Sequence, residues 1–114
     1  MVVAPSPIVD ERLLTEAVRR ILSAGDPRKI ILFGSHARGN SRTGSDLDIL
    51  IVEDHCDLPQ RQRATRYRAA LLGLHPSKDI IVCTVAEIEQ SAGDPLAFIT
   101  TVVREGKVLY DRRD

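Results

Sequence analysis

Acidic residues stand at the start of two apolar runs. Asp46 and Asp48 precede the run 49–52, and Asp79 precedes the run 80–83. Side chains two residues apart on a strand point to the same face, so we expect the carboxylates of Asp46 and Asp48 to lie side by side. At about 5 Å they would repel by about 3 kcal/mol at an effective dielectric near 20, a cost that a bound cation removes. If the two strands are neighbours, Asp79 joins the pair in an oxygen-only site, which suits Mg²⁺ or Mn²⁺.

Simpler interpretations of these acids stay open at this point. A pair of aspartates can serve only to keep a strand end solvated or to cap a helix. For Asp79 taken alone, that interpretation carries as much weight as the metal site.

A glycine-containing turn follows an earlier apolar run. Gly34-Ser35 comes directly after residues 30–33, and Gly39 and Gly44 lie within the next ten residues. Such a turn can present free backbone N–H groups to a phosphate, with the Ser35 hydroxyl as a further donor and Arg38 as a counter-charge. A Gly-Ser pair after a strand is also common in plain turns. Together with the three acids, however, a phosphate-binding loop predicts a two-metal site for phosphoryl or nucleotidyl transfer.

These motifs resemble those of a known family. The segment Gly34-Ser35-His36-Ala37-Arg38-Gly39, followed after five residues by Ser45-Asp46-Leu47-Asp48-Ile49-Leu50-Ile51-Val52, is similar to the signature of the minimal nucleotidyltransferases of the polymerase-beta superfamily. Asp79 falls where that family's third carboxylate is expected. The resemblance spans roughly residues 10–110.

The resemblance implies a fold, a reaction and a set of site residues. The fold would be an α/β (α+β) polymerase-beta-like core, a mixed sheet with helices on one side. The reaction would transfer a nucleoside monophosphate, AMP from ATP, to an acceptor hydroxyl. The implied catalytic residues, which would also hold two Mg²⁺ ions, are Asp46, Asp48 and Asp79, and the implied nucleotide-binding residues are Gly34, Ser35, Arg38, Gly39 and Ser45.

The resemblance also implies a protein partner. Small members of this family typically pair with a helical HEPN ribonuclease toxin, and they act as antitoxins that adenylylate a tyrosine of the toxin. We therefore expect a hetero-oligomer with a HEPN-type toxin. Two alternatives remain: an antitoxin that neutralises its toxin by binding alone, and a transferase whose acceptor, a small molecule or a nucleic acid, is held by a separate subunit.

Short apolar runs predict the strands that position these residues. Residues 30–33, 49–52 and 80–83 are apolar on both faces, which is typical of buried strands. Residues 107–110 predict a short edge strand. Helices on a sheet of two-sided strands make an α/β or α+β layered domain.

Spacing and capping residues predict four helices. Apolar residues recur at helical spacing from Leu13 to Leu22, after Asp10 and before Gly25. A second helix is expected between Pro59 and Gly73. The third begins at the capping box formed by Thr84 and Glu87, and the fourth runs from Asp94-Pro95 to Gly106.

Composition limits the class of protein. The chain has 114 residues, 43% of them hydrophobic and 28% charged, which predicts a single globular domain over 1–114 with its core at about 10–110. Because 16 basic and 16 acidic residues cancel, overall attraction to nucleic acid or an anionic membrane is not expected. With no leader-like start and no membrane-spanning run, a cytoplasmic protein is expected.

Two further features have structural interpretations. Cys56 and Cys83 form no metal-binding spacing, so we expect two buried thiols. The arginines between residues 58 and 78 flank an apolar stripe, which predicts the solvated edges of an amphipathic helix.

Overall fold

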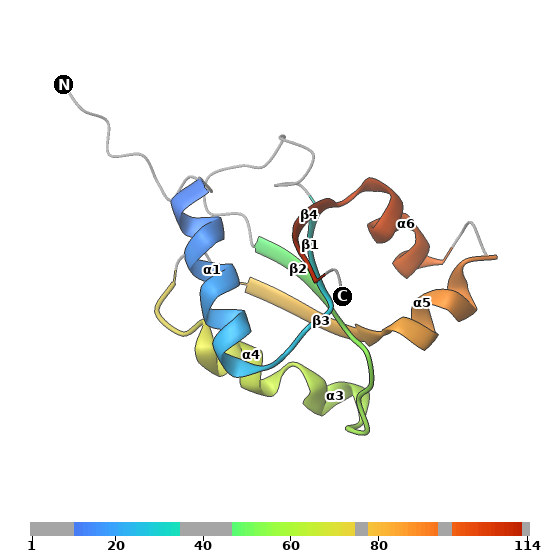
Figure 1. The fold of residues 1–114 in the computed structure, drawn as a ribbon, viewed down its shortest axis with the longest axis horizontal. Coiled ribbons are helices and arrows are strands. Elements are labelled where there is room, and N and C mark those ends of the chain that lie inside the picture. Colours follow the sequence, from blue (N-terminus) through green and yellow to red (C-terminus); the bar gives the residue numbers. More distant parts are fainter. Residues whose placement is uncertain (1–10, 35–46, 75–77, 94–96, 113–114) are drawn as a thin grey trace.

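A four-stranded mixed sheet forms the centre of the molecule (Figure 1). The computed structural model describes residues 11–34, 47–74, 78–93 and 97–112. The strand order is β3-β2-β1-β4, where the strands are β1 (Lys29–Phe33), β2 (Leu47–Glu53), β3 (Lys78–Thr84) and β4 (Lys107–Asp111). β1 is antiparallel to β2 and β4, whereas β2 is parallel to β3. The α/β class, the three buried strands and the short edge strand are therefore as predicted.

Helices cover both faces of the sheet. One face packs against α1 (Glu11–Ala24) and α4 (Thr65–Ala70), and the other packs against α5 (Val85–Ser91) and α6 (Phe98–Glu105) (Figure 1). The expectation of helices on one side only is wrong. The strands carry apolar side chains on both faces, since Ile30 and Leu32 belong to one core and Ile31 belongs to the other. Each face of the sheet is therefore buried beneath its own helices.

The predicted second helix is interrupted. It consists of α3 (Gln60–Arg63) and α4, which are separated at Ala64. Both parts contact β3, and α4 also packs against α1. Gln60 Nε2 donates to the Val82 carbonyl of β3 at 3.0 Å, whereas α4 places Tyr67 in the core beneath α1.

The other helices follow their predicted signals closely. Thr84 and Glu87 form the expected capping box at the start of α5, and α6 ends at Gly106. Burial alone would raise the pKa of Glu87, but hydrogen bonds from Arg63 and from the Thr84 backbone hold it below its usual value. The predicted helix starts at Asp10 and at Asp94-Pro95 lie outside the described residues, and α6 begins at Phe98.

The expectations for the arginines of the second predicted helix and for the two cysteines need correction. Arg63 and Arg66 are not merely solvated edges of a helix, because Arg63 pairs with Glu87 at 2.7 Å and Arg66 pairs with Glu53. Of the two thiols, only Cys83 is buried and Cys56 is half-buried. Burial raises the pKa of the Cys83 thiol to about 12.

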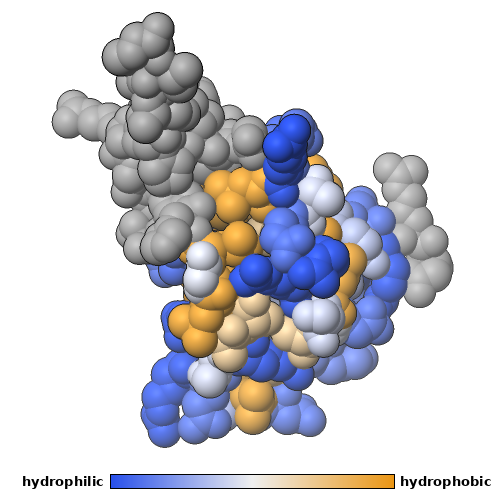
Figure 2. Space-filling view, turned by 90° about the vertical axis from the view of Figure 1, so that its left-hand side faces the viewer, coloured by the Kyte–Doolittle hydropathy of each residue, from blue (hydrophilic) through white to orange (hydrophobic). Residues whose placement is uncertain are grey.

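The exposed surface of α1 is mixed in character. Figure 2 shows hydrophilic and apolar side chains interspersed on the side of the molecule where α1 lies. On this helix, Glu16 accepts hydrogen bonds from Arg19 and from Arg20, at 3.0 Å and 2.8 Å respectively. None of the helices in the described ranges is long and apolar enough to cross a membrane.

A buried polar group closes the end of β2 away from Asp48. Tyr67 is fully buried, and its hydroxyl donates to the carboxylate of Glu53, which is 4% exposed and also accepts from Arg66. Burial, together with the neighbouring Glu53, raises the pKa of Tyr67 above its usual range. Gly25 lies against the Tyr67 ring, where a Cβ would lie 3.0 Å from Cζ.

Replacing Tyr67 with Phe should lower the free energy of unfolding by about 1–3 kcal/mol, because the buried Glu53 carboxylate loses a hydrogen-bond donor. Urea denaturation followed by circular dichroism measures this change. The matched control is Tyr110→Phe on the half-buried edge strand, which should change stability by less than about 0.5 kcal/mol. Equal effects of the two variants would contradict a special role for the buried hydroxyl.

Candidate active site

Asp48 and Asp79 are direct neighbours on adjacent parallel strands. The register pairs Asp48 of β2 with Asp79 of β3. Both lie on the α5/α6 face, because the residues beside them, Leu47, Ile49 and Ile80, belong to the opposite core. Adjacent strands are about 4.8 Å apart, so the two carboxylates meet at one end of the sheet. Asp48 is half-buried and Asp79 is exposed.

Gly34 lies against the other side of Asp48. β1 ends at Phe33, which pairs with Asp48, and Gly34 follows with a φ of +78°. A Cβ on Gly34 would collide with Asp48 Oδ2 and would lie 3.1 Å from Asp48 Cγ. The position therefore favours glycine for two reasons, the left-handed backbone and the carboxylate packed upon it.

The remaining predicted site residues lie outside the described residues. These are Asp46, Ser35, Arg38, Gly39 and Ser45. Of the predicted site, the structure therefore brings together Gly34, Asp48 and Asp79. Within the described ranges there is no group of three or more His, Cys, Asp or Glu residues that could hold a metal ion.

The donor set nevertheless fits a divalent cation. Two carboxylates that share one end of a sheet offer only oxygen ligands, as Mg²⁺ and Mn²⁺ prefer. Lys78, next to Asp79 in sequence, pairs with Leu47 in the register and so lies on the opposite face of β3, where its Nζ donates to the carbonyl of Leu74. Burial, with a smaller contribution from Arg20, lowers the pKa of Lys78. Asp48 and Asp79 are thus the residues that would hold the metal, together with the predicted ligand Asp46.

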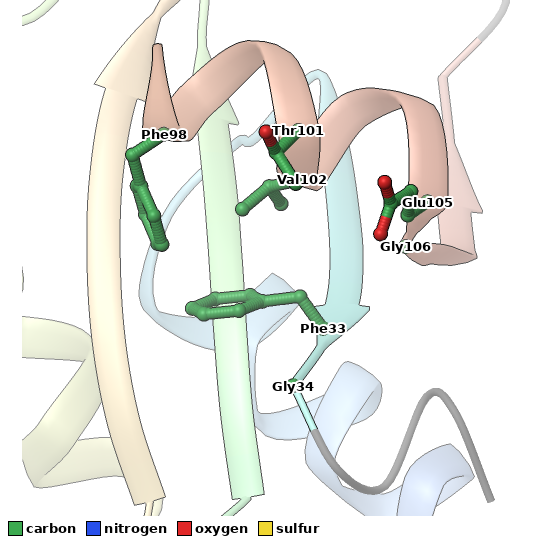
Figure 3. Close-up of a pocket in the computed structure, with 7 residues that line it drawn as sticks. All are labelled: Phe33, Gly34, Phe98, Thr101, Val102, Glu105 and Gly106. Atoms are coloured by element: carbon green, nitrogen blue, oxygen red, sulfur yellow. The ribbon is translucent and has the colours of Figure 1, made fainter. Parts of the chain in front are cut away.

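A pocket that the sequence motifs did not indicate opens beside Gly34. It has a volume of about 240 Å³ and lies between α6 and the end of β1 (Figure 3). Its aromatic members, Phe33 and Phe98, project toward each other with ring centroids 5.5 Å apart and planes at 80°. No local pattern in the sequence signals it, because Phe33 and Phe98, the latter 52% exposed, come from distant segments of the chain.

Comparison with a protein family agrees with this arrangement. The family described as "Polymerase beta, Nucleotidyltransferase" matches residues 16–114. The match begins within α1 and includes every later element of the sheet and its two helical layers.

Two individual proteins are also similar to this chain, one in sequence and one in fold. The chain is 49% identical over 105 residues to a Methanocaldococcus jannaschii protein named "Putative protein adenylyltransferase MJ0604", covering 89% of this chain and 98% of that protein. A crystal structure described as that of "a putative nucleotidyltransferase from Sulfolobus solfataricus" superposes with a TM-score of 0.63 at 22% identity. That similarity covers 89% of this chain and 79% of the other, and it concerns the fold.

The contact between Gly34 and Asp48 can be tested with two glycines that share a backbone conformation. Gly73 also has a positive φ, of +90°, but nothing lies within 4 Å of a Cβ placed there. Gly73→Ala should therefore lower the free energy of unfolding by about 1–2 kcal/mol, the cost of the left-handed conformation alone. Gly34→Ala should cost more, because it also displaces Asp48, and it should reduce nucleotide transfer where Gly73→Ala does not.

Chemical denaturation and a transfer assay with labelled nucleotide measure these effects. If Gly34→Ala were no more damaging than Gly73→Ala in both assays, the packing of Asp48 on Gly34 would have no functional importance.

Proposed function

The chain belongs to the polymerase beta nucleotidyltransferase family and is a nucleotidyltransferase, and from this premise we propose that it transfers AMP from ATP to a hydroxyl group of a partner protein. The observation that carries the proposal is the pairing of Asp48 with Asp79 beside Gly34. The similarity to a protein named as a protein adenylyltransferase supports a protein acceptor.

The proposed reaction is an in-line displacement at the α-phosphorus of ATP. The acceptor oxygen attacks this phosphorus, the bond from the phosphorus to the oxygen bridging toward the β-phosphate breaks, and pyrophosphate leaves. We assign removal of the proton from the acceptor hydroxyl to Asp79, which is exposed near the start of the edge strand β3. The product is a phosphodiester between AMP and the acceptor.

Each side chain has a distinct part in this reaction. Two divalent cations, Mg²⁺ or Mn²⁺, would supply Lewis-acid stabilisation of the phosphate charge when bound. Asp48, Asp79 and Asp46 would hold them. Gly34, which has no side chain, would let the triphosphate approach the backbone closely. The further proposed contacts of the triphosphate are Ser35, Arg38, Gly39 and Ser45.

The proposed partner is a HEPN-type toxin, modified on a tyrosine, so that this chain acts as its antitoxin in a hetero-oligomer. Support comes from the family resemblance and from the open position of Asp79. An exposed edge of the sheet can receive a side chain carried on a flexible loop or tail, whereas a hydroxyl fixed in a folded core could not reach it.

Asp48→Asn and Asp79→Asn should each reduce transfer by at least about a hundredfold, because each removes a carboxylate from the reacting centre. Both variants should stay folded or become slightly more stable, since one of two repelling charges is gone. Transfer of label from α-³²P-ATP with Mg²⁺ measures the loss, and chelation of the metal should abolish transfer by the unmodified protein.

The matched control is Asp57→Asn, which removes the same charge from an exposed residue outside the site and should leave the rate unchanged. Full activity of Asp48→Asn, or unfolding of both site variants, would overturn the assignment of these carboxylates to the reaction.

The acceptor can be identified by mass. Incubation with ATP, Mg²⁺ and the proposed HEPN-type toxin should raise the mass of one toxin segment by whole AMP units, and Asp79→Asn should give no rise. Peptide mass spectrometry locates the modified residue. A toxin that is neutralised with no change in mass would contradict adenylylation and would favour neutralisation by binding alone.

A further inference from the structure

The pocket between α6 and β1 is built to take a flat ring. Its apolar lining combines Phe33 and Phe98 with Val102 and with two glycines, Gly34 and Gly106. The two phenyl rings meet edge to face and leave aromatic surface facing the pocket (Figure 3). At about 240 Å³ the pocket is smaller than the roughly 300 Å³ at which sites enclose drug-sized ligands, so it suits one ring system rather than a whole nucleotide.

The pocket is held rigidly at its inner end. A Cβ on Gly106 would lie 2.6 Å from the Val102 carbonyl oxygen and 2.9 Å from that of Leu32, so α6 ends in close contact with β1. The Gly106 N–H also donates to the Val102 carbonyl at 2.8 Å. The position of Phe98 relative to Phe33 is therefore set by the packing of α6 on the sheet.

The pocket lies beside the proposed reacting centre and shares Gly34 with it. Gly34 lines the pocket and also packs against the carboxylate of Asp48. Phe33, the neighbouring lining residue, pairs with Asp48 across the β1–β2 register and lies on the same face of the sheet. A ring in this pocket would be directly beside whatever occupies the centre at Asp48.

The strand order indicates which substrate the ring belongs to. Asp79, where the acceptor hydroxyl must arrive, lies on β3, whereas the end of β1, from which Phe33 and Gly34 line the pocket, is two positions away in the sheet. In the proposed function Gly34 contacts the triphosphate. The ring beside it is then the base of the nucleotide and not the aromatic ring of an acceptor tyrosine.

A carboxylate among the residues that line the pocket could distinguish one nucleotide base from another. Glu105 is the single charged residue among those that line the pocket in the described part of the chain. Its carboxylate is more than half exposed at the rim, where it pairs with Arg104 at 3.1 Å. A carboxylate only accepts hydrogen bonds, so it favours a base edge with an exocyclic amine over one with a carbonyl oxygen.

We propose that this pocket binds the purine base of the nucleotide, with Phe98 and Phe33 against the ring and Glu105 accepting a hydrogen bond from the exocyclic amine of adenine. The inference rests on the proposed function. It adds that α6 determines base preference, ATP over ITP, while the carboxylates at the strand ends act on the phosphates.

Calorimetry with two probes distinguishes the contribution of the base to binding from that of the phosphates. The probes are a non-hydrolysable ATP analogue and inorganic tripolyphosphate, each with Mg²⁺. Phe98→Ala should raise the Kd of the ATP analogue by about tenfold, as expected for loss of one base–aromatic contact. The same variant should leave the Kd of tripolyphosphate unchanged within about twofold, because the phosphate site is separate in this account.

The matched control is Val103→Ala, an exposed residue of the same helix that does not line the pocket. It should bind both probes like the unmodified protein. A Phe98→Ala variant that binds the ATP analogue normally, or that loses tripolyphosphate equally, would overturn the base pocket. Absence of nucleotide binding by the unmodified protein would instead contradict the proposed function itself.

Base preference provides a second, independent test. Glu105→Gln introduces an amide that can donate to the O6 of hypoxanthine, so the ratio of kcat/KM for ATP to that for ITP should fall at least about fivefold. An unchanged ratio would overturn the part assigned to Glu105.

Discussion

The pairing register of β2 with its two neighbours is the constraint on which the site depends. Asp48 lies opposite Phe33 on one side and Asp79 on the other, and these contacts exist only in this register. A slip by one residue would turn the whole side-chain set of β2 to the opposite face. The slip is opposed by burial, because Leu47, Ile49 and Ile51 are fully buried in one core while Leu50 and Val52 are buried in the other. The apolar strand residues thereby fix the position of the polar ones.

The two ends of β2 carry polar groups with different environments. At the Asp48 end the half-buried carboxylate lies beside Gly34 and the exposed Asp79. At the far end Glu53 is buried, accepts hydrogen bonds from Tyr67 and Arg66, and is enclosed by α4. The first arrangement places two carboxylates side by side at one end of the sheet, whereas in the second the Tyr67 and Arg66 donors both bind Oε2 of the buried Glu53. This difference explains why one end of the strand is suited to chemistry and the other to stability.

Much of this arrangement could be predicted from local sequence patterns. The apolar runs predicted β1, β2 and β3, the Thr84–Glu87 spacing predicted the start of α5, and the register brings together Gly34, Asp48 and Asp79 of the predicted site. The break at Ala64 was not predicted from local patterns, because the contacts of this segment, such as that of Gln60 with Val82, involve elements distant in sequence. The pocket was missed for the same reason. Phe33 and Phe98 are 65 residues apart in the chain, and only the packing of α6 on the sheet brings them together.

The central claim is that the carboxylates paired at the ends of β2 and β3 bind the divalent cation required for nucleotidyl transfer. Paramagnetic broadening by Mn²⁺ in ¹H–¹⁵N spectra, with a non-hydrolysable ATP analogue present, tests it residue by residue. The account predicts the strongest broadening at the amides of Gly34, Asp48 and Asp79, weakening along the same strands toward Glu53 and Thr84. Broadening centred on the Glu53 end, or spread evenly over the protein, would contradict it.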